Sequence, residues 1–347
     1  MSGKIIGIDL GTKVLKLYRK GDGVIFDQQN VIAVENRKKL LAIGDAAAEM
    51  MEKAPMKIRV TYPVHNGVIA DVSSMHRLFN ECFRQLYGAP KKARGLSFLI
   101  ALPTDITEVE KRAFVDLVLS SEVPSKRVNL VDKPICVALG AGLDVTNSTG
   151  IMTVDIGADT TEVSILSLGG IVLSKLINLG GNHIDASIKL SIKKNYNLHI
   201  GDKTAEMVKK EIASAVPSET VTRMVRGRDV VTGLPKEVEV SSDMVYEAIQ
   251  ENLHTIVDAV RIILERTPPE ISSDIMDAGV YVTGGSANIG HLADLFHRET
   301  NLKINIMDDP ENMVVKGLGA IMENNQIDTL SYAYQQANFS LMAKEEK

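Results

Sequence analysis

The sequence predicts an α/β protein made of two related domains, and two observations carry this prediction. Short apolar runs typical of strands alternate with amphipathic runs typical of helices along the whole chain. Residues 5–18, "IIGIDLGTKVLKLY", and residues 151–166, "IMTVDIGADTTEVSIL", also share one layout. In each, an apolar strand ends in Asp-apolar-Gly, and a polar turn leads to a second strand. Aligning Asp9 with Asp155 also aligns Gly11 with Gly157, which indicates two related domains that face one another.

Strands are expected wherever short apolar runs are bounded by turn residues. At the start of the chain, "KIIGIDL" and "VLKLYRK" flank a Gly-Thr turn, and "KGDG" leads into "VIFDQ". Further on, "LSFLIALP" is uniformly apolar and is expected to be a buried strand.

Helices are expected at three places with helical periodicity or a capping signal. From Met75 the apolar residues recur at i, i+3, i+4 and i+7, and Gly88 ends this helix. Thr107 with Glu110 three residues later forms a capping box for the next helix. A long helix spans about 243–266 and stops at "TPP".

Length and composition limit the classes of function. A chain of 347 residues with 45% hydrophobic content suits two domains with large cores. The formal net charge of −5 gives no reason to expect nucleic-acid binding. Only two cysteines, Cys82 and Cys136, occur, which argues against a disulfide framework or a cysteine-based zinc site. Neither a signal peptide nor an apolar run of roughly 20 residues is evident, so we expect a cytoplasmic protein.

Two facing hairpins of this kind are suited to clamp a polyphosphate. Each turn offers consecutive backbone N–H groups as an anion nest, and glycine lets the backbone come close. Asp9 and Asp155, one at each strand end, are candidates to hold the waters of a bound Mg²⁺, and one of them to orient an attacking water. Thr12, Thr160 and Thr161 add hydroxyl donors. The alternative is two plain β-hairpins whose acids simply end strands.

A third stretch, "GVYVTGGSANIGHL" at 279–292, follows the second hairpin. An apolar strand runs into Gly-Gly-Ser and then a helix, and the glycines let a flat ring lie against the backbone at the helix N-terminus. Its place after the second hairpin predicts a nucleoside clamp. Because junctions of this kind are common, a purely structural role is the alternative.

These three motifs, in this order, resemble the actin superfamily, and most closely its MreB family. The resemblance runs from about residue 4 to residue 325, and the "RGRDVVTGLPK" segment is specific to the MreB branch. Other matching segments are "PVHNGVIADV", "VALGAGLDV", "SLGGIV", "YNLHIGDKTAEMVKKEI" and "ERTPPEISSDIMDAGVYVTGG". The resemblance implies the actin-like fold, in which a ribonuclease H-like domain is duplicated around a central nucleotide cleft and each half carries a smaller subdomain, giving four subdomains.

The resemblance also implies how the chain is divided. The expected parts are domain I at 1–145 (smaller subdomain about 33–65, with 315–335 packing back on it), domain II at 146–314 (smaller subdomain about 182–244), and a C-terminal tail at 336–347.

ATP and Mg²⁺ are the cofactors that the resemblance implies, with ADP left after turnover. It assigns nucleotide contacts to the two loops, to the Gly-Gly-Ser motif, and to two charges on one helix that would face the ribose and adenine. These residues are Gly11, Thr12, Lys13 and Val14; Gly157, Ala158, Asp159, Thr160 and Thr161; Gly284, Gly285, Ser286 and Ala287; and Lys209 and Glu211.

Both phosphate loops depart from the family pattern. The first usually reads Gly-Thr-Ala-Asn-Thr, whereas this chain has Lys13 and Val14 after Gly-Thr; Lys13 either contacts phosphate or points to solvent. The second usually has three consecutive glycines, two of which are replaced here by Ala158 and Asp159. Alanine is unfavourable if the turn needs a positive φ. A carboxylate 4 Å from a phosphate charge costs about 1 kcal/mol in water and about 4 kcal/mol at intermediate dielectric, unless it turns outward or contacts the metal.

A third departure concerns hydrolysis. The family usually has a glutamate, which helps to activate the attacking water, before the proline of its "AAAIGAG" helix; here "LVDKPICVALGAG" places Lys133 there. A protonated lysine cannot accept a proton from water, and such a residue contributes roughly 10²–10⁴-fold to the rate. Asp132 is a weak substitute, because it points elsewhere on a regular backbone. The candidate catalytic residues are therefore Asp155, Thr160, Asp132 and the substituted Lys133, and we expect slow or absent hydrolysis with nucleotide binding retained.

In the family, ATP-bound subunits polymerise under the membrane and guide cell-wall synthesis. The implied partners are copies of this chain or an MreB-type paralogue, together with the cell-wall elongation machinery. The implied role is in cell shape, at the cytoplasmic face of the membrane. The loop "GAPKKARGLS" is either a weak membrane contact, at about 1 kcal/mol per basic residue, or a solvated turn. The tail at 327–347 is expected to be an added helix or a frayed end.

Three readings of function stay open at this level. The leading one is a filament-forming nucleotide-binding protein. A second is an actin-fold scaffold with impaired hydrolysis that modulates an active MreB. A third is a sugar kinase, which the MreB-specific segments disfavour.

Overall fold

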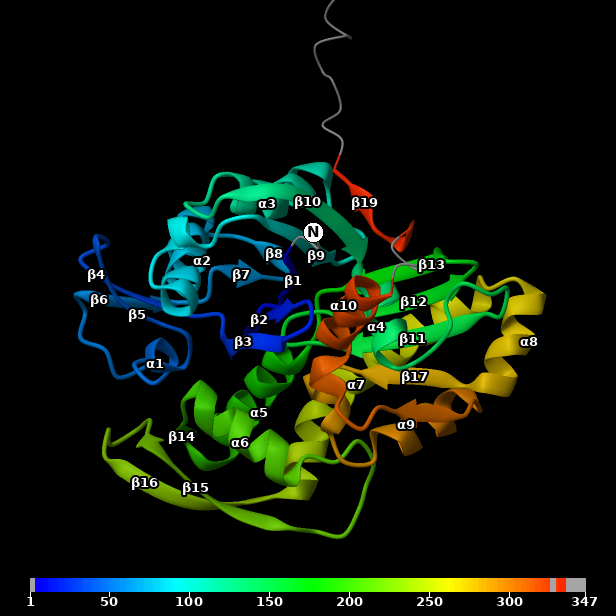
Figure 1. The fold of residues 1–347 in the computed structure, drawn as a ribbon. Coiled ribbons are helices and arrows are strands. Elements are labelled where there is room, and N and C mark those ends of the chain that lie inside the picture. Colours follow the sequence, from blue (N-terminus) through cyan, green and yellow to red (C-terminus); the bar gives the residue numbers. More distant parts are fainter. Residues whose placement is uncertain (1–3, 325–328, 335–347) are drawn as a thin grey trace, which may run out of the picture.

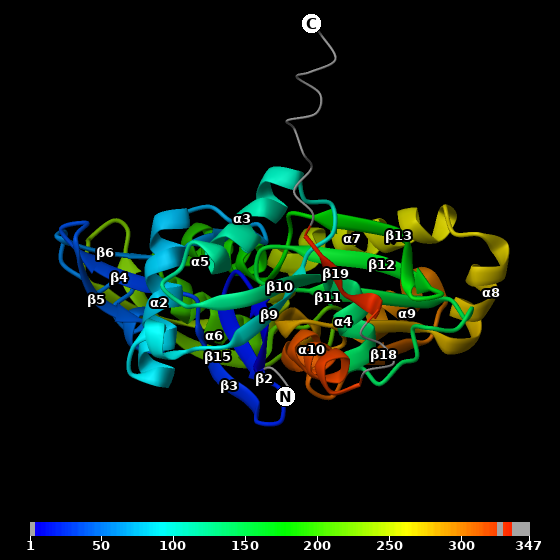
Figure 2. The same ribbon diagram turned by 45° about the horizontal axis from the view of Figure 1, so that its top comes forward.

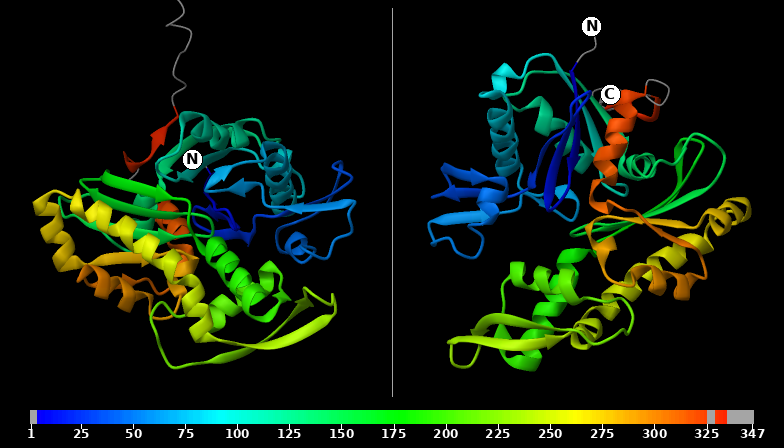
Figure 3. Two further views of the ribbon diagram at one scale, coloured as in Figure 1. Left: turned by 180° about the vertical axis from the view of Figure 1, so that it is seen from behind. Right: turned by 60° about the horizontal axis from the view of Figure 1, so that its bottom comes forward.

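The structure is a computed structural model that describes residues 4–324 and 329–334. Two large sheets form its two halves, and Figure 1 and the right view of Figure 3 show the halves joined along one side. Figure 2 shows the two sheets next to each other. The tail at 336–347, and most of the segment at 327–347, lie outside the described residues.

The first sheet has six strands, all from the first half of the chain except the last. Its order is β3 (Gly23–Gln29), β2 (Val14–Arg19), β1 (Lys4–Leu10), β9 (Leu96–Leu102), β10 (Ser125–Asp132) and β19 (Tyr332–Ala333). The hairpin strands β1, β2 and β3 pair antiparallel, whereas β1, β9 and β10 run parallel.

The second sheet repeats this arrangement with five strands. Its order is β13 (Gly170–Ile177), β12 (Thr161–Ser167), β11 (Ile151–Ile156), β17 (Val280–Thr283) and β18 (Ile304–Ile306). Again the first three strands pair antiparallel and the last three run parallel. The repeat that the two hairpins predicted is therefore a repeat of the whole sheet, and the α/β class is confirmed.

In the described ranges, three smaller sheets hold the remaining strands. One lies beside the first large sheet, one beside the second, and the third is a hairpin with an Asn-Gly turn. They are β5 (Lys39–Ile43), β4 (Ile32–Glu35) and β6 (Ile58–Thr61); β14 (Leu198–His199), β15 (Thr222–Asp229) and β16 (Pro235–Ser241); and β7 (Val64–His65) with β8 (Val68–Ile69). The domain bounds given by the sequence stay a prediction.

The three helices expected from the sequence, at 75–88, after Thr107 and at about 243–266, are confirmed. The helices of the described residues, with η marking short 3₁₀ helices, connect and cover the sheets. They are α1 (Gly44–Ala48), α2 (Val72–Tyr87), η1 (Pro90–Lys92), α3 (Glu108–Leu119), α4 (Lys133–Gly140), α5 (Gly181–Tyr196), α6 (Asp202–Ile212), α7 (Ser242–Glu265), α8 (Pro269–Ala278), η2 (Gly285–Asn288), α9 (Leu292–Thr300), η3 (Pro310–Asn312) and α10 (Met313–Glu323). The capping box at Thr107 forms at the start of α3, and Gly88 ends α2 with φ 77°.

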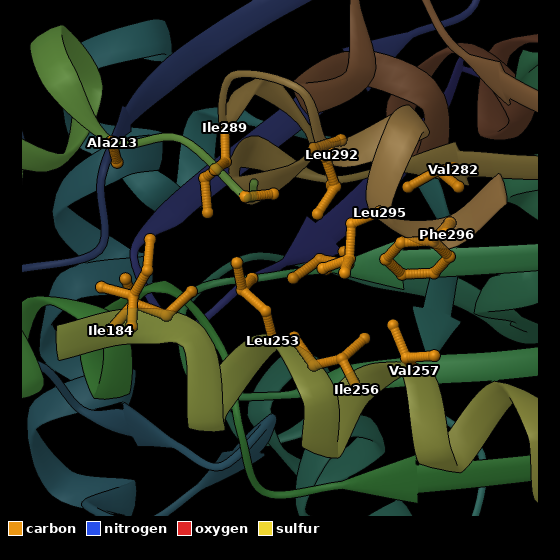
Figure 4. Close-up of a cluster of buried hydrophobic side chains, with 14 of the residues drawn as sticks. Ile184, Ala213, Leu253, Ile256, Val257, Val282, Ile289, Leu292, Leu295 and Phe296 are labelled. Carbon is orange, nitrogen blue, oxygen red and sulfur yellow. The ribbon is translucent and has the colours of Figure 1, made fainter. Parts of the chain in front are cut away.

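Separate apolar cores support the two halves. In the second half, Leu253 and Val257 of α7 point toward Leu295 and Phe296 of α9, as Figure 4 shows. The first half buries a cluster that includes Phe79, Phe83 and Phe98. Burial at roughly 25 cal/mol per Å² of apolar surface makes each core the main source of stability for its half.

A third apolar cluster joins the halves where α4 packs against α10. It includes Cys136 of α4 and Leu318 of α10, with Ile151 and Leu166 of the second sheet. The two helices approach so closely that a Cβ added at Gly317 would lie 1.9 Å from the carbonyl oxygen of Cys136. A larger residue at Gly317 would therefore force the helices apart.

Candidate functional site

The two hairpin turns meet at one cavity of about 440 Å³ between the halves. Most of the residues predicted to form the site line it. They are Asp9, Gly11, Thr12, Lys13, Val14, Lys133, Asp155, Gly157, Ala158, Thr160, Lys209, Gly284, Gly285 and Ser286.

Each hairpin turn closes with the same backbone hydrogen bond. The amide of Gly11 donates to the carbonyl of Val14 at 3.0 Å, and the amide of Gly157 donates to that of Thr160 at 2.9 Å. The sequence alignment of Gly11 with Gly157 thus corresponds to an equivalence of backbone geometry.

Neighbouring segments hold the turns in place. Asn30, fully buried, donates its backbone N–H to the carbonyl of Lys13 at 2.8 Å and its side-chain Nδ2 to that of Gly11 at 2.9 Å. The N-terminal amides of α5 at Gly181 and Asn182 donate to the carbonyls of the second turn at 2.9 and 2.7 Å. Both turns are therefore held in place by contacts within the chain itself.

Amides at the turn tips remain available. Thr12, Lys13, Ala158 and Asp159 lie between the strands of their hairpins. Within the described ranges, their N–H groups take part in none of the backbone hydrogen bonds that hold the turns and loops. Consecutive unengaged amides in a turn form a concave anion site. This geometry favours phosphate oxygens as the ligand.

The Gly-Gly-Ser motif closes the cavity on the side of the second half. Gly284 has φ 85°, and a Cβ there would lie 2.4 Å from the carbonyl oxygen of Ile156, so only glycine fits without a shift. The hydroxyl of Ser286 lies 3.4 Å from the carbonyl oxygen of Gly157 and donates to it. The motif therefore packs directly on the second turn.

Asp159 turns away from the cavity. Its Oδ2 accepts from the backbone N–H of Asn66 at 3.0 Å, and its Oδ1 accepts from Nδ2 of Asn182 at 2.7 Å. Ala158 and Asp159 are not among the described residues with positive φ, so replacing glycine in this turn causes no backbone strain. The anticipated repulsion of phosphate is weakened because the carboxylate does not line the cavity.

Lys13 pairs with a carboxylate on the other side of the cavity. The two alternatives drawn from the sequence, contact with phosphate and exposure to solvent, did not include this pair. The Nζ of Lys13 lies 2.5 Å from Oε2 of Glu206 on α6, and Glu206 also pairs with Lys210 at 2.9 Å. Burial raises the pKa of Glu206, but the two lysines outweigh burial and bring the pKa to about 2. Glu206 is therefore ionised at neutral pH and joins the two halves.

Lys133 lies among three carboxylates. Its Nζ is 2.5 Å from Oδ2 of Asp155, and Asp9 and Glu162 also act on it. Burial lowers the pKa of Lys133, but the three acids outweigh burial and raise it above its ordinary value. Burial raises the pKa of Asp9 to about 6 and that of Glu162 to about 7, with Lys133 opposing both shifts. Lys133 is therefore a fixed cation at the cavity wall.

Five predicted residues do not line the cavity. Asp132 accepts from the hydroxyl of Tyr332 on β19 at 3.3 Å. The hydroxyl of Thr161 donates to the carbonyl of Leu179 at 2.7 Å, and Glu211 pairs with Arg223. Asp159 is placed as described above, and Ala287 is buried in the core of the second half.

Several charged residues that line the cavity were not among those predicted from the sequence. Lys16 lies opposite Asp9 in the first hairpin and donates to the carbonyl of Glu311 at 2.8 Å. A charge in the middle of an apolar strand was the available signal for it. Glu206 gave no comparable signal, because its contact depends on how the halves close. The ionisable residues lining the cavity are five lysines, at positions 13, 16, 133, 209 and 210, and four acids, Asp9, Asp155, Glu206 and Glu311.

This donor set fits a nucleotide polyphosphate better than it fits Mg²⁺. Lysines and unengaged amides favour phosphate oxygens. Asp155, one of the two predicted partners of a hydrated Mg²⁺, is already engaged by Lys133. In the part of the chain that the structure describes, no group of three or more His, Cys, Asp or Glu side chains is arranged to hold a metal.

Comparison with known proteins agrees with the fold and the motifs. The family model described as MreB/Mbl protein matches residues 3–329. The cell shape-determining protein Mbl of Bacillus subtilis is 37% identical over 328 residues, which is 93% of this chain and 97% of that protein. The cell shape-determining protein MreB of Escherichia coli is 35% identical over 92% of this chain and 93% of that protein.

Among solved structures, MreB 5 of Spiroplasma citri bound to AMPPNP superimposes with a TM-score of 0.89. It is 34% identical, and the match covers 95% of this chain and 98% of that one. The predicted actin-like fold and the predicted family are thereby confirmed: the chain belongs to the MreB/Mbl family.

Proposed function

We propose that this chain binds an adenine nucleotide in the cavity and assembles, alone or with a second MreB-type chain, into actin-like filaments. The observation that carries the proposal is the pair of equivalent turns, closed at 3.0 and 2.9 Å, that face one cavity with unengaged amides. Two plain hairpins with only a structural role would have no reason to share such a cavity.

The relatives support the choice of nucleotide. The Spiroplasma citri protein, 34% identical, was solved both bound to AMPPNP and bound to ADP. In this chain the turn amides and Lys16 and Lys210 would hold the phosphates, and Gly284 and Ser286 the nucleoside. Bound ATP supplies the triphosphate whose presence or loss would alter the contact between the two halves.

Hydrolysis is proposed to be slow. An ammonium group cannot take a proton from water, and Lys133 is held in its charged form by its acidic neighbours. Asp132, the weak substitute, contacts Tyr332 and does not line the cavity. Thr160 and Asp155 do line it, but Asp155 is engaged by Lys133.

The substitution Lys133→Glu tests this step. It should raise the rate of phosphate release from ATP by about tenfold or more, since it restores a general base. The measurement is single-turnover phosphate release from protein saturated with ATP. An unchanged rate in folded, nucleotide-bound Lys133→Glu would show that Lys133 does not limit hydrolysis.

The cellular role follows from the family and is proposed accordingly. The curated relatives are cell shape-determining proteins, so we place this chain at the cytoplasmic face of the membrane with the cell-wall elongation machinery. No helix in the described ranges has the length and apolarity needed to cross a bilayer. Lys91, Lys92 and Arg94 are exposed, and such residues contribute only about 1 kcal/mol each near anionic lipid. Membrane contact through them would therefore be weak.

Two measurements test the proposal. Titration calorimetry of purified monomer with ADP and AMPPNP should show saturable binding, and sedimentation should show more pelleted protein with ATP than without. Absence of binding by folded protein would overturn the nucleotide site. Binding without pelleting, alone or with an MreB-type partner, would favour a regulator that does not polymerise. ATP-dependent phosphorylation of added sugars would favour a kinase.

A further inference from the structure

The most unusual feature of the cavity is a lysine among carboxylates that come from both halves. Lys133 begins α4 on the first half, and its Nζ lies 2.5 Å from Oδ2 of Asp155, at the end of β11 in the second half. Asp9, at the equivalent strand end in the first half, lies close enough for its charge to act on the ammonium. The ammonium thus pairs with one of the two acids that align in the sequence repeat and is attracted by the other.

We propose that Lys133 is a built-in cation that replaces Mg²⁺ at the cavity wall, so that this chain binds its nucleotide without a divalent metal. The inference rests on the proposed nucleotide site and adds a property to it, namely which cation accompanies the nucleotide.

The electrostatic requirement is simple. Asp9 and Asp155 would repel a polyphosphate, and a bound cation normally removes that repulsion, because it is the largest local charge in such a site. Here the positive charge belongs to a side chain of the protein, so it is present whether or not metal is available. That side chain is only 21% exposed. With Lys133 the lysines lining the cavity outnumber the acids five to four. A glutamate at that position would reverse this ratio.

The same pair disfavours metal binding. A hydrated Mg²⁺ bound by Asp155 would have to displace the ammonium at 2.5 Å. That exchange would place a divalent cation next to the ammonium, and like charges so close to each other repel.

The ion pair has a plainer explanation, which is that it only holds the two halves together. That explanation predicts a change in stability, but no change in the metal dependence of nucleotide binding, when Lys133 is replaced. Metal dependence therefore distinguishes the two.

The experiment is equilibrium binding of ADP and of AMPPNP to the full chain, in excess Mg²⁺ and in excess EDTA. For the unaltered protein we expect dissociation constants within about threefold of each other in the two conditions. For Lys133→Glu we expect binding at least about tenfold weaker in EDTA than in Mg²⁺, because the cavity is then lined by five acids and four lysines and Asp155 has lost the ammonium beside it.

Two variants serve as controls. Lys193→Glu makes the same change in charge at an exposed position of α5, outside the cavity lining, and should keep the metal-independent behaviour of the unaltered protein. Lys133→Gln removes the cation without adding an acid and should show a smaller metal dependence than Lys133→Glu. It also serves if Lys133→Glu fails to fold.

The possible outcomes distinguish the role proposed for Lys133 from the proposed nucleotide site on which it rests. Tight binding by the unaltered protein in Mg²⁺, lost in EDTA, overturns the inference and leaves the nucleotide site intact. No binding in either condition overturns the nucleotide site itself. Metal-independent binding by both the unaltered protein and folded Lys133→Glu shows that Lys133 is not the reason, and also overturns the inference.

Discussion

At the residue scale, neighbouring lysines on one helix differ widely in their surroundings. Lys209 of α6 donates to the carbonyl of Gly181 at 2.9 Å and pairs with Asp185 at 2.9 Å, and both side chains of the pair are less than a tenth exposed. Burial lowers the pKa of Lys209 and raises that of Asp185, which shows that both charges are poorly solvated. The next residue, Lys210, is 63% exposed and pairs with Glu206. The ion pairs of these two adjacent lysines are therefore expected to contribute differently to the stability of the fold.

The substitution Lys209→Met should lower the free energy of unfolding by about 3 kcal/mol, because it leaves the buried Asp185 carboxylate without its partner. Its matched control, Lys210→Met, should cost less than about 1 kcal/mol, since it breaks an exposed pair. Urea unfolding of nucleotide-free protein measures both. Equal costs would contradict the burial argument.

Glu162 predicts a pH dependence of stability. Burial raises its pKa from the ordinary 4.5 to about 7, helped by Asp155 and opposed by Lys133 and by the Thr104 amide at 2.5 Å. Between these two pKa values the folded state binds more protons than the unfolded state, so stability falls as pH rises through this window. The loss amounts to at most about 3.5 kcal/mol, at about 1.4 kcal/mol for each unit by which the pKa rises.

The substitution Glu162→Gln should therefore flatten the decline between about pH 5 and pH 7.5. A smaller decline should persist, because burial also raises the pKa of Asp9, from 3.8 to about 6. Thermal unfolding of the unaltered protein and the variant across this range is the measurement. A variant with the full decline would show that Glu162 is not its source.

At the scale of elements, the hairpin of β7 and β8 connects the two phosphate turns. Asn66 and Gly67 at its tip have φ of 50° and 77°, as a tight Asn-Gly turn requires. The amide of Gly67 lies 3.4 Å from the hydroxyl of Thr12 in the first turn, and that of Asn66 donates to Asp159 in the second. Asp159 is thus a bridge between the halves.

The substitution Asp159→Gly tests whether Asp159 bridges the two halves or, as expected from the sequence, repels bound phosphate. Because the carboxylate does not line the cavity, ADP affinity should change by less than about threefold. Deuterium uptake at residues 64–69 should rise, since the bridge to Asn66 is lost. A rise in affinity of about tenfold or more would instead show that Asp159 repels the phosphates.

Features that depend on residues close together in the chain could be predicted from the sequence, whereas contacts between distant residues could not. The two hairpins, the capping box at Thr107 and the long helix at 243–266 depend on local periodicity and turn chemistry, and the structure contains all of them. Contacts such as that of Lys13 with Glu206 join residues far apart in the chain. They depend on how the halves close, which no local pattern encodes, so the role of Lys13 could not be settled from its sequence neighbours.

At the scale of the whole molecule, polar contacts hold the cavity closed on the side of α6. Lys13 pairs with Glu206 at 2.5 Å, and the amide of Asp202, the first residue of α6, donates to Glu52 at 3.3 Å. The opposite side is held by the apolar packing of α4 against α10. The polar side is the weaker one, because few apolar side chains would be exposed when it separates.

Opening on that side should therefore limit the exchange of nucleotide. The substitution Glu206→Ala removes the pair with Lys13 and should speed both association and dissociation of a fluorescent ADP analogue by about threefold to tenfold, with a smaller change in affinity. Stopped-flow mixing measures both rates. Glu237→Ala breaks the exposed pair with Arg226 within the sheet of β15 and β16 and should leave them unchanged. If dissociation of the analogue were as slow in Glu206→Ala as in the unaltered protein, the pair would not control opening, and the α4–α10 side would be the place to look for the barrier.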